Sequence, residues 1–239
     1  MAFAPQRPDD GTSDATCWEY FTGMKQELRA TFLRDEEIRQ FSRDLRILLA
    51  TNGTLTRILS ILANEEVIAQ VVNQDIHDSA PEATDPERFP KRRTIHRQVL
   101  LKGRSSGKLL VVAESLTSVD LAPSEFIENL TEISYPVGEL LLANRIEAFK
   151  ETPKFWTCAL PDWLDVDEYP NLSRQAVARR YRVIISGQPA IAITEYFPES
   201  IFACSTKTVM GASDDHAALD MGISERCHEG SIQQETPVC

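Results

Sequence analysis

The chain has 239 residues, of which 42% are hydrophobic and 26% are charged, and it carries a formal net charge of −11. This composition is typical of a soluble globular protein with one domain or two small ones, and the charge argues against a nucleic-acid binder with a generally basic surface. No apolar run approaches the roughly 20 residues of a membrane-spanning helix. The five cysteines form no C-x-x-C pair, so we expect a reduced, cytoplasmic protein without a metal site.

The first part of the chain combines a polar lead-in with a helical pattern. Residues 1–17 are rich in proline, aspartate, serine and threonine, and residues 1–37 are expected to form a partly disordered N-terminal extension. The pattern turns helical from Trp18 to about Ala50, with apolar residues at three- and four-residue steps, namely Ile38, Phe41, Leu45 and Leu48. A second short helix is expected after residues 51–54, with an apolar side formed by Leu55, Ile58, Leu59 and Leu62.

The middle of the chain is rich in strand signals. β-Branched residues at Val67–Val72 predict a strand, and Arg97–Leu101 and Leu109–Glu114 flank the turn sequence G-R-S-S-G, which is typical of a hairpin. Ser124 then begins a helical stretch, and a further helix is expected at Glu139–Phe149.

The last third of the chain contains the clearest hairpin. Residues 150–175 are expected to form a long irregular loop, either a lid over a site or an ordinary surface connection. Arg180–Ile185 and Ala190–Phe197 then form two strands around S-G-Q-P. Residues 205–239 lack periodicity and are expected to be a disordered tail, which leaves one domain at 38–204. Helices beside antiparallel hairpins predict an α+β fold.

Two charged residues share strand faces with large apolar ones. By alternation, Glu195 lies on the same side of its strand as Ile191, Ile193 and Phe197. Arg97 likewise shares a side with Val99 and Leu101. If the second hairpin turn has only Gly187 and Gln188 at its tip, Arg180 lies opposite Glu195. A buried carboxylate must be paired or must change its pKa, although such charges are often structural or reach solvent at strand ends.

Several motifs occur in an order that resembles the chorismate–pyruvate lyase (4-hydroxybenzoate synthase) family, especially its cyanobacterial and archaeal branch. The similarity covers roughly residues 40–202. It is carried by L-L-A-T-N-G-T-L-T-R-I-L at Leu48–Leu59, R-x-V-x-L at Arg97–Leu101, L-L-V-V-A-E-S-L at Leu109–Leu116, Y-P-V-G-E-L-L at Tyr135–Leu141 and A-R-R-Y-R-V-I-I-S-G-Q-P-A-I-A-I-T-E-Y-F-P at Ala178–Pro198. The ordered set, rather than any single motif, supports the resemblance.

The resemblance implies a lyase that removes pyruvate from chorismate to give 4-hydroxybenzoate, without a cofactor, in quinone or secondary metabolism. It implies a single antiparallel β-sheet with helices packed on it and an internal ligand pocket. At matching positions, Arg97 would hold the ring carboxylate, Glu195 would assist at the departing oxygen, and Leu55 and Val137 would contact the ring. The partner would be a small-molecule carboxylate substrate, and the chain would act as a monomer or weak homo-oligomer.

These residue types suit that reaction. A guanidinium binds a carboxylate through two planar hydrogen bonds, and a carboxyl group in an apolar pocket can hold a proton near neutral pH and donate it. Two alternatives stay open at this point. One is a pathway-specific homologue that acts on another cyclic carboxylate by elimination or cyclisation, and the other is a non-catalytic small-molecule-binding module of the same fold. The presence of both Arg97 and Glu195 favours the lyase.

Overall fold

The computed structural model of the chain describes residues 30–78, 93–132 and 135–203. Within these ranges, seven strands form one antiparallel sheet in the order β1-β2-β3-β7-β6-β4, and β5 also pairs with β6. The strands are β1 (Val67–His77), β2 (Thr94–Gly103), β3 (Leu109–Ser118), β4 (Ala148–Lys150), β5 (Lys154–Ala159), β6 (Gln175–Ile185) and β7 (Gln188–Pro198). The expected α+β fold with a single antiparallel sheet is therefore confirmed.

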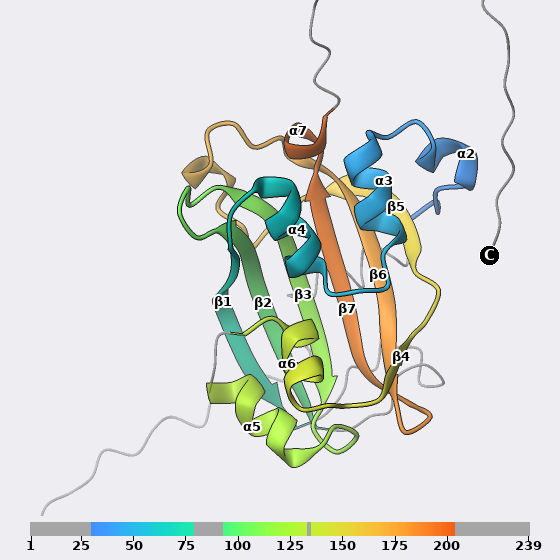
Figure 1. Ribbon diagram of the computed structural model, residues 1–239, viewed down its shortest axis with the longest axis vertical. Helices are drawn as coiled ribbons and strands as arrows, with labels where there is room; N and C mark the ends of the chain where they lie inside the picture. Colours follow the sequence, from blue (N-terminus) through green and yellow to red (C-terminus); the bar gives the residue numbers. More distant parts are fainter. Residues whose placement is uncertain (1–29, 79–92, 133–134, 204–239) are drawn as a thin grey trace, which may run out of the picture. The chain divides into compact units, whose positions relative to one another are not determined.

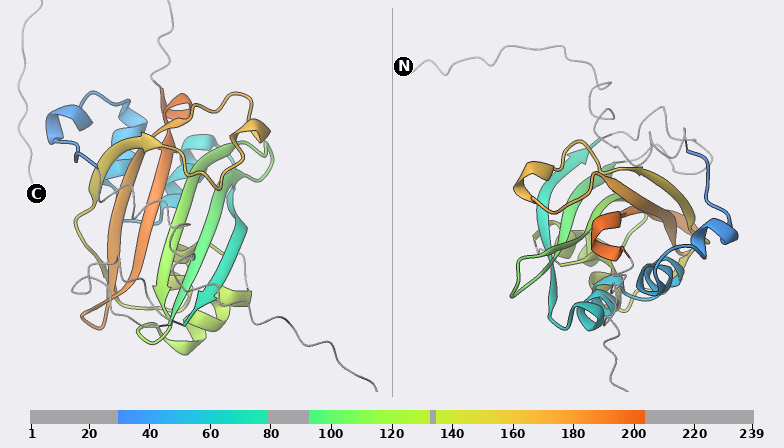
Figure 2. Two further views of the ribbon diagram at one scale, coloured as in Figure 1. Left: turned by 180° about the vertical axis from the view of Figure 1, so that it is seen from behind. Right: turned by 90° about the horizontal axis from the view of Figure 1, so that it is seen from above.

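Short helices surround this sheet, and α3, α4 and α6 lie over one of its faces (Figure 1). The opposite face is seen from behind in Figure 2. The helical segments are α2 (Asp35–Ile38), α3 (Arg43–Ala50), α4 (Leu55–Ala63), α5 (Ser124–Glu132), α6 (Val137–Ala143), the 3₁₀ helix η2 (Val166–Glu168) and α7 (Glu199–Phe202). None of the helices in the described ranges is long and apolar enough to cross a membrane.

The apolar residues of the helices pack on the sheet in two clusters. One cluster joins α3 and α4 to β1 through residues such as Leu48, Leu59 and Val67. The other joins α5 and α6 to β6 and β7 through residues such as Phe126 and Ile191. Burial of these side chains provides the main favourable contribution to packing of the helices on the sheet.

The expected helix before Ala50 is two helices in the structure. Residues Asp35–Ile38 form α2, and α3 begins only at Arg43. The break lies at Ser42, whose side chain caps α3 by accepting a hydrogen bond of 3.3 Å from the Leu45 amide. A serine that caps a new helix interrupts a periodic pattern that the apolar spacing alone would continue. The short helix at Leu55–Ala63 is confirmed as α4.

Two predictions between α5 and β6 are wrong. The predicted helix at Glu139–Phe149 ends at Ala143 in the structure, because Arg145 adopts a positive φ of 52° and residues 148–150 pair with β6 as β4. The predicted irregular loop at 150–175 contains β5, which pairs with β6 and buries Trp156. Strand partners that are distant in sequence determine both segments, so local patterns do not reveal them.

The second hairpin is confirmed, but its predicted register is wrong. The tip consists of Ser186 and Gly187, which both have positive φ, and the ladder shifts by one residue just beyond the turn. Glu195 therefore pairs with Arg179, whereas Arg180 pairs with Thr194. A bulge inserts one unpaired residue into a strand, and this moves every later pair by one position.

The two ends of the chain are not part of the described structure. Most of the predicted N-terminal extension, residues 1–29, and the whole predicted tail, residues 205–239, lie outside the described residues. The boundaries of 1–37, 38–204 and 205–239 therefore stay predictions.

Candidate functional site

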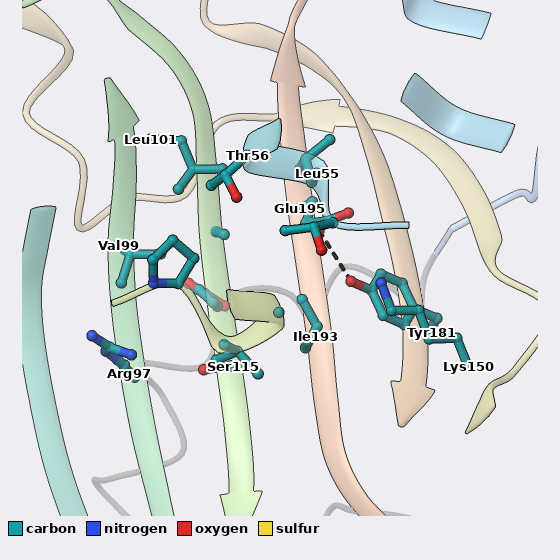
Figure 3. Close-up of a pocket in the computed structure, with 16 residues that line it drawn as sticks. Leu55, Thr56, Arg97, Val99, Leu101, Ser115, Lys150, Tyr181, Ile193 and Glu195 are labelled. Carbon is teal, nitrogen blue, oxygen red and sulfur yellow. Dashed lines mark hydrogen bonds between the residues drawn. The ribbon is translucent and has the colours of Figure 1, made fainter. Parts of the chain in front are cut away.

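A cavity lies on the helix-covered face of the sheet, between the two apolar clusters (Figure 3). Its empty volume, which includes open solvent at its mouth, is about 580 Å³. The wall is formed by Thr54, Leu55, Thr56, Arg97, Val99, Leu101, Ala113, Glu114, Ser115, Pro136, Val137, Gly138, Lys150, Tyr181, Ile193 and Glu195. The four residues that the sequence singled out, Arg97, Glu195, Leu55 and Val137, are all among them.

The sheet register explains why Arg97 and Glu195 face the same cavity. Arg97 on β2 pairs with Ser115 on β3, which pairs with Ile193 on β7. Glu195 follows Ile193 by two residues on the same strand and so has the same orientation. Strands two apart in a sheet are separated by about 10 Å. The two charged side chains therefore approach a common cavity from opposite sides, as Figure 3 shows.

Arg97 is 1% exposed, and its Nη1 donates a hydrogen bond of 2.9 Å to the Tyr135 carbonyl. Burial lowers the pKa of Arg97 to about 10, so its guanidinium remains charged at neutral pH. The Tyr135 carbonyl lies just before Pro136 and Val137, which begin the α6 side of the cavity wall. The arginine is thereby positioned beside α6 with its charge close to the cavity.

Glu195 is 4% exposed and has two donors. Its Oε2 accepts hydrogen bonds from Arg179 Nε at 2.7 Å and Nη2 at 2.5 Å, and its Oε1 accepts one from the Tyr181 hydroxyl at 3.1 Å. Hydrogen bonds between a guanidinium and a carboxylate are charge-assisted and are stronger than those between neutral groups. Glu195 therefore has the partner that a buried carboxylate needs, but this partner is Arg179, with Tyr181, and not Arg180.

Arg179 is a functional candidate that the sequence did not predict. Its Nη1 donates to the carbonyls of Leu48, Leu49 and Thr51, at 2.5, 3.1 and 3.0 Å, at the end of α3. A cation at a helix C-terminus satisfies carbonyls that lack partners within the helix. Arg179 thus ties Glu195 to α3. Its position opposite Glu195 depends on the bulge beyond the hairpin turn, and no feature of the sequence marks that bulge.

Tyr181 and Lys150 complete the Glu195 side of the cavity. Burial, followed by the nearby Glu195 charge, raises the pKa of Tyr181 well above its usual value, so its hydroxyl remains a hydrogen-bond donor. Lys150 Nζ lies 5.3 Å from the centre of the Tyr181 ring and donates a hydrogen bond of 2.9 Å to the Gly53 carbonyl. Burial lowers the pKa of Lys150. Lys150 was missed because its segment was predicted to be helix and loop, whereas it ends β4.

This arrangement can hold a small cyclic anion. Apolar walls from Leu55, Val137 and Ile193 can contact a ring, and Arg97 offers a charged hydrogen-bond donor at one end. The opposite end offers a paired carboxylate that can accept a hydrogen bond or a proton. In the described ranges, no group of three or more His, Cys, Asp or Glu side chains is arranged to hold a metal ion.

The chain is similar to several known proteins. The family model described as chorismate pyruvate-lyase Rv2949c-like matches residues 49–204. The chorismate pyruvate-lyase of Mycobacterium tuberculosis H37Rv is 49% identical over 174 residues, which make up 72% of this chain and 87% of that protein. The chorismate pyruvate-lyase of Mycobacterium leprae is 48% identical over 170 residues, or 71% and 81% of the two chains. The crystal structure of PhnF from Mycobacterium smegmatis has a TM-score of 0.47 and 10% identity, over 62% of this chain and 65% of that one.

Proposed function

The chain belongs to the Rv2949c-like chorismate pyruvate-lyase family, and on that premise we propose that it removes pyruvate from chorismate inside the cavity of Figure 3. The observation that carries the proposal is the placement of two deeply buried charged residues, Arg97 and Glu195, on opposite sides of one small, largely apolar cavity. Chorismate is a cyclic diene with a carboxylate at one end of its ring and a hydroxyl group and an enolpyruvyl ether at the other. The cavity likewise has Arg97 at one end and the paired carboxylate of Glu195 at the other.

Arg97 is proposed to bind the ring carboxylate. Its guanidinium is charged and buried, and a carboxylate can accept two parallel hydrogen bonds from it. Leu55 on α4 and Val137 on α6 are proposed to contact the two faces or edges of the ring, since both line the cavity. Binding in one orientation places the ether and hydroxyl end of the ring towards Glu195. Positioning of this kind supplies much of the rate enhancement in a reaction of a single substrate.

Glu195 is proposed to move the proton that the reaction transfers. The bond between ring carbon and ether oxygen breaks, and its electron pair leaves with the enolpyruvate oxygen. The neighbouring hydroxyl-bearing carbon loses its proton, and the ring becomes aromatic. The carboxylate of Glu195, held by Arg179 and Tyr181, is proposed to take up this ring proton and to return it to the departing oxygen. Enolpyruvate then tautomerises to pyruvate, so no external oxidant or cofactor is needed.

Incubation of the purified chain with chorismate tests the activity directly. We expect equal amounts of 4-hydroxybenzoate and pyruvate, detected by mass spectrometry. A different product from chorismate, or turnover of another cyclic carboxylate alone, would instead support a pathway-specific homologue. Binding of 4-hydroxybenzoate without any turnover would support a non-catalytic binding module.

Substitution of the two charged residues tests their roles. Arg97→Gln and Glu195→Gln should each lower kcat/KM for chorismate by about 10²-fold or more, as expected for loss of a positioned catalytic group. The matched controls are Arg34→Gln and Glu37→Gln, which remove the members of an exposed pair at the N-terminal end of α2, and they should leave kcat/KM unchanged. Full activity in Glu195→Gln would show that Glu195 does not move the proton.

A further inference from the structure

The Glu195 end of the cavity contains one more cation than its carboxylate can neutralise. Arg179 contacts Glu195 through Nε and Nη2, and its Nη1 donates hydrogen bonds to backbone carbonyls, so all three nitrogens already have partners within the protein. Glu195 therefore already has a charge partner. Lys150 Nζ donates to a neutral group, the Gly53 carbonyl, and among the described residues it forms no ion pair.

Lys150 is placed where it can reach a ligand. It is the last residue of β4, at the edge of the sheet, and it pairs with Val183 on β6. Figure 3 shows its side chain beside the Tyr181 ring, on the same side of the cavity as Glu195 and away from Arg97. An ammonium group has three donors, and the Gly53 carbonyl accepts one of them. A partly desolvated cation with unused donors is a strong site for an anion.

The substrate in the proposed function supplies a matching anion. Chorismate has two carboxylates, one on the ring and one on the enolpyruvyl group, whereas 4-hydroxybenzoate keeps only the ring carboxylate. If Arg97 holds the ring carboxylate, the enolpyruvyl carboxylate lies at the Glu195 end. We propose that Lys150 binds this second carboxylate, so that the cavity selects a dicarboxylate substrate over its monocarboxylate product. This inference rests on the proposed function.

A purely structural role for Lys150 makes a different prediction. Its hydrogen bond to Gly53 joins β4 to the segment that precedes α4. If that bond alone mattered, loss of Lys150 would weaken the binding of substrate and product by the same factor. If Lys150 binds the enolpyruvyl carboxylate, only ligands with a second carboxylate are affected.

Steady-state kinetics separate these roles. In Lys150→Gln, which removes the charge but keeps a donor, KM for chorismate should rise by about 10- to 100-fold, the range for loss of a hydrogen bond to a charged group. The inhibition constant of 4-hydroxybenzoate should change by less than about twofold, because that ligand makes no use of Lys150. Lys150→Arg should recover part of the affinity for chorismate. The control is Lys102→Gln, since Lys102 lies over the Tyr169 ring and is not part of the cavity wall.

A pair of stable ligands tests the site without turnover. The dicarboxylate 3-(carboxymethoxy)-4-hydroxybenzoate should bind the unmodified chain about tenfold or more tightly than 3-methoxy-4-hydroxybenzoate, as measured by calorimetry. This preference should disappear in Lys150→Gln and persist in Lys102→Gln. Equal affinity of the unmodified chain for both ligands, or an equal loss for both in Lys150→Gln, would refute the Lys150 site while chorismate turnover still stood. Failure of the unmodified chain to turn over chorismate would refute the proposed function itself.

Discussion

At the scale of single residues, the ion pair between Arg179 and Glu195 places two opposite charges where both side chains are almost fully buried. Removal of one member of such a pair leaves the other charge buried without a partner, which costs about 3–5 kcal/mol. Arg179→Met should therefore lower the free energy of unfolding by this amount, as measured in urea, and should also abolish lyase activity. Arg174→Met is the control, because the Arg174–Asp167 pair is exposed and such pairs contribute about 0–1 kcal/mol.

The double variant Arg179→Met/Glu195→Met extends this test. With both charges replaced by apolar side chains, much of the stability should return, because no buried charge is left unpaired. Activity should not return, since the proposed proton-transfer group is absent. If the double variant is as unstable as Arg179→Met, the cost lies in the lost contacts of Arg179 with α3 rather than in the unpaired Glu195.

His96 makes a separate prediction about pH. Burial, followed by the charge of His77, lowers the pKa of His96 from 6.5 to about 4. The unfolded chain therefore binds a proton at this position between pH 6.5 and 4, whereas the native chain does not. The contribution of His96 to the free energy of unfolding is fully present above pH 6.5. It is lost as the pH drops towards 4, and the total loss is about 3 kcal/mol. In His96→Asn, unfolding followed at pH 7 and pH 4.5 should show a smaller loss between the two values, and an unchanged loss would exclude this assignment.

The residues of the site could be predicted from sequence only where strand alternation applies. Arg97 and Glu195 each lie on a regular strand, so alternation placed them correctly on the cavity face. Leu55 and Val137 came from the family resemblance, and both line the cavity. Arg179 could not be predicted, because two local details together set its pairing with Glu195. The hairpin tip lies one residue earlier than predicted, which moves the partner from Arg180 to Ala178, and the unpaired residue beyond the turn moves it by one position to Arg179.

At the scale of elements, the N-terminal cap of α3 is the feature with the clearest measurable effect. Ser42 accepts a hydrogen bond from the Leu45 amide, and loss of such a cap costs about 1 kcal/mol. Ser42→Ala should therefore lower the melting temperature, whereas Ser42→Asp should not, because aspartate caps equally well and its charge favours a helix N-terminus. Equal melting temperatures for Ser42→Ala and the unmodified chain would show that α3 is held by packing alone.

Elements with local signals were predictable, and elements that depend on distant partners were not. Apolar spacing and turn residues indicated α4, α5 and both hairpins. The sequence also predicted a helix through Phe149, but residues 148–150 form β4 instead because they pair with Val183–Ile185 of β6. Local propensity is a weak prior that tertiary contacts override.

At the scale of the whole molecule, the described residues that line the cavity all come from one part of the chain. The residues that line it lie between Thr54 and Glu195, which agrees with the match of the family model to residues 49–204. We therefore predict that removal of residues 205–239 leaves kcat/KM for chorismate within about twofold of the full chain. The measurement is the same product assay on both chains. A loss of about tenfold or more would assign a catalytic or binding contribution to that segment.

The overall architecture was more predictable than its details, because many strands and helices contribute to the same pattern. Antiparallel hairpins with helices between them indicated an α+β fold, and the order of motifs indicated the family and, through that resemblance, a single antiparallel sheet. The net charge of −11 gave no sign of the cations at the cavity, since charge totals average over the surface while Arg97, Arg179 and Lys150 act locally.

The attachment of Arg179 to the end of α3 links a helix outside the cavity wall to the state of the cavity. Among the described residues, none from α3 lines the cavity, yet α3 cannot separate from the sheet without breaking the bonds that also orient the partner of Glu195. Opening of α3 would therefore remove the carbonyl acceptors that help to hold Arg179 beside Glu195, so the two regions are coupled. A ligand that binds at Glu195 should consequently slow amide hydrogen exchange in α3, and this helix would report occupancy without touching the ligand.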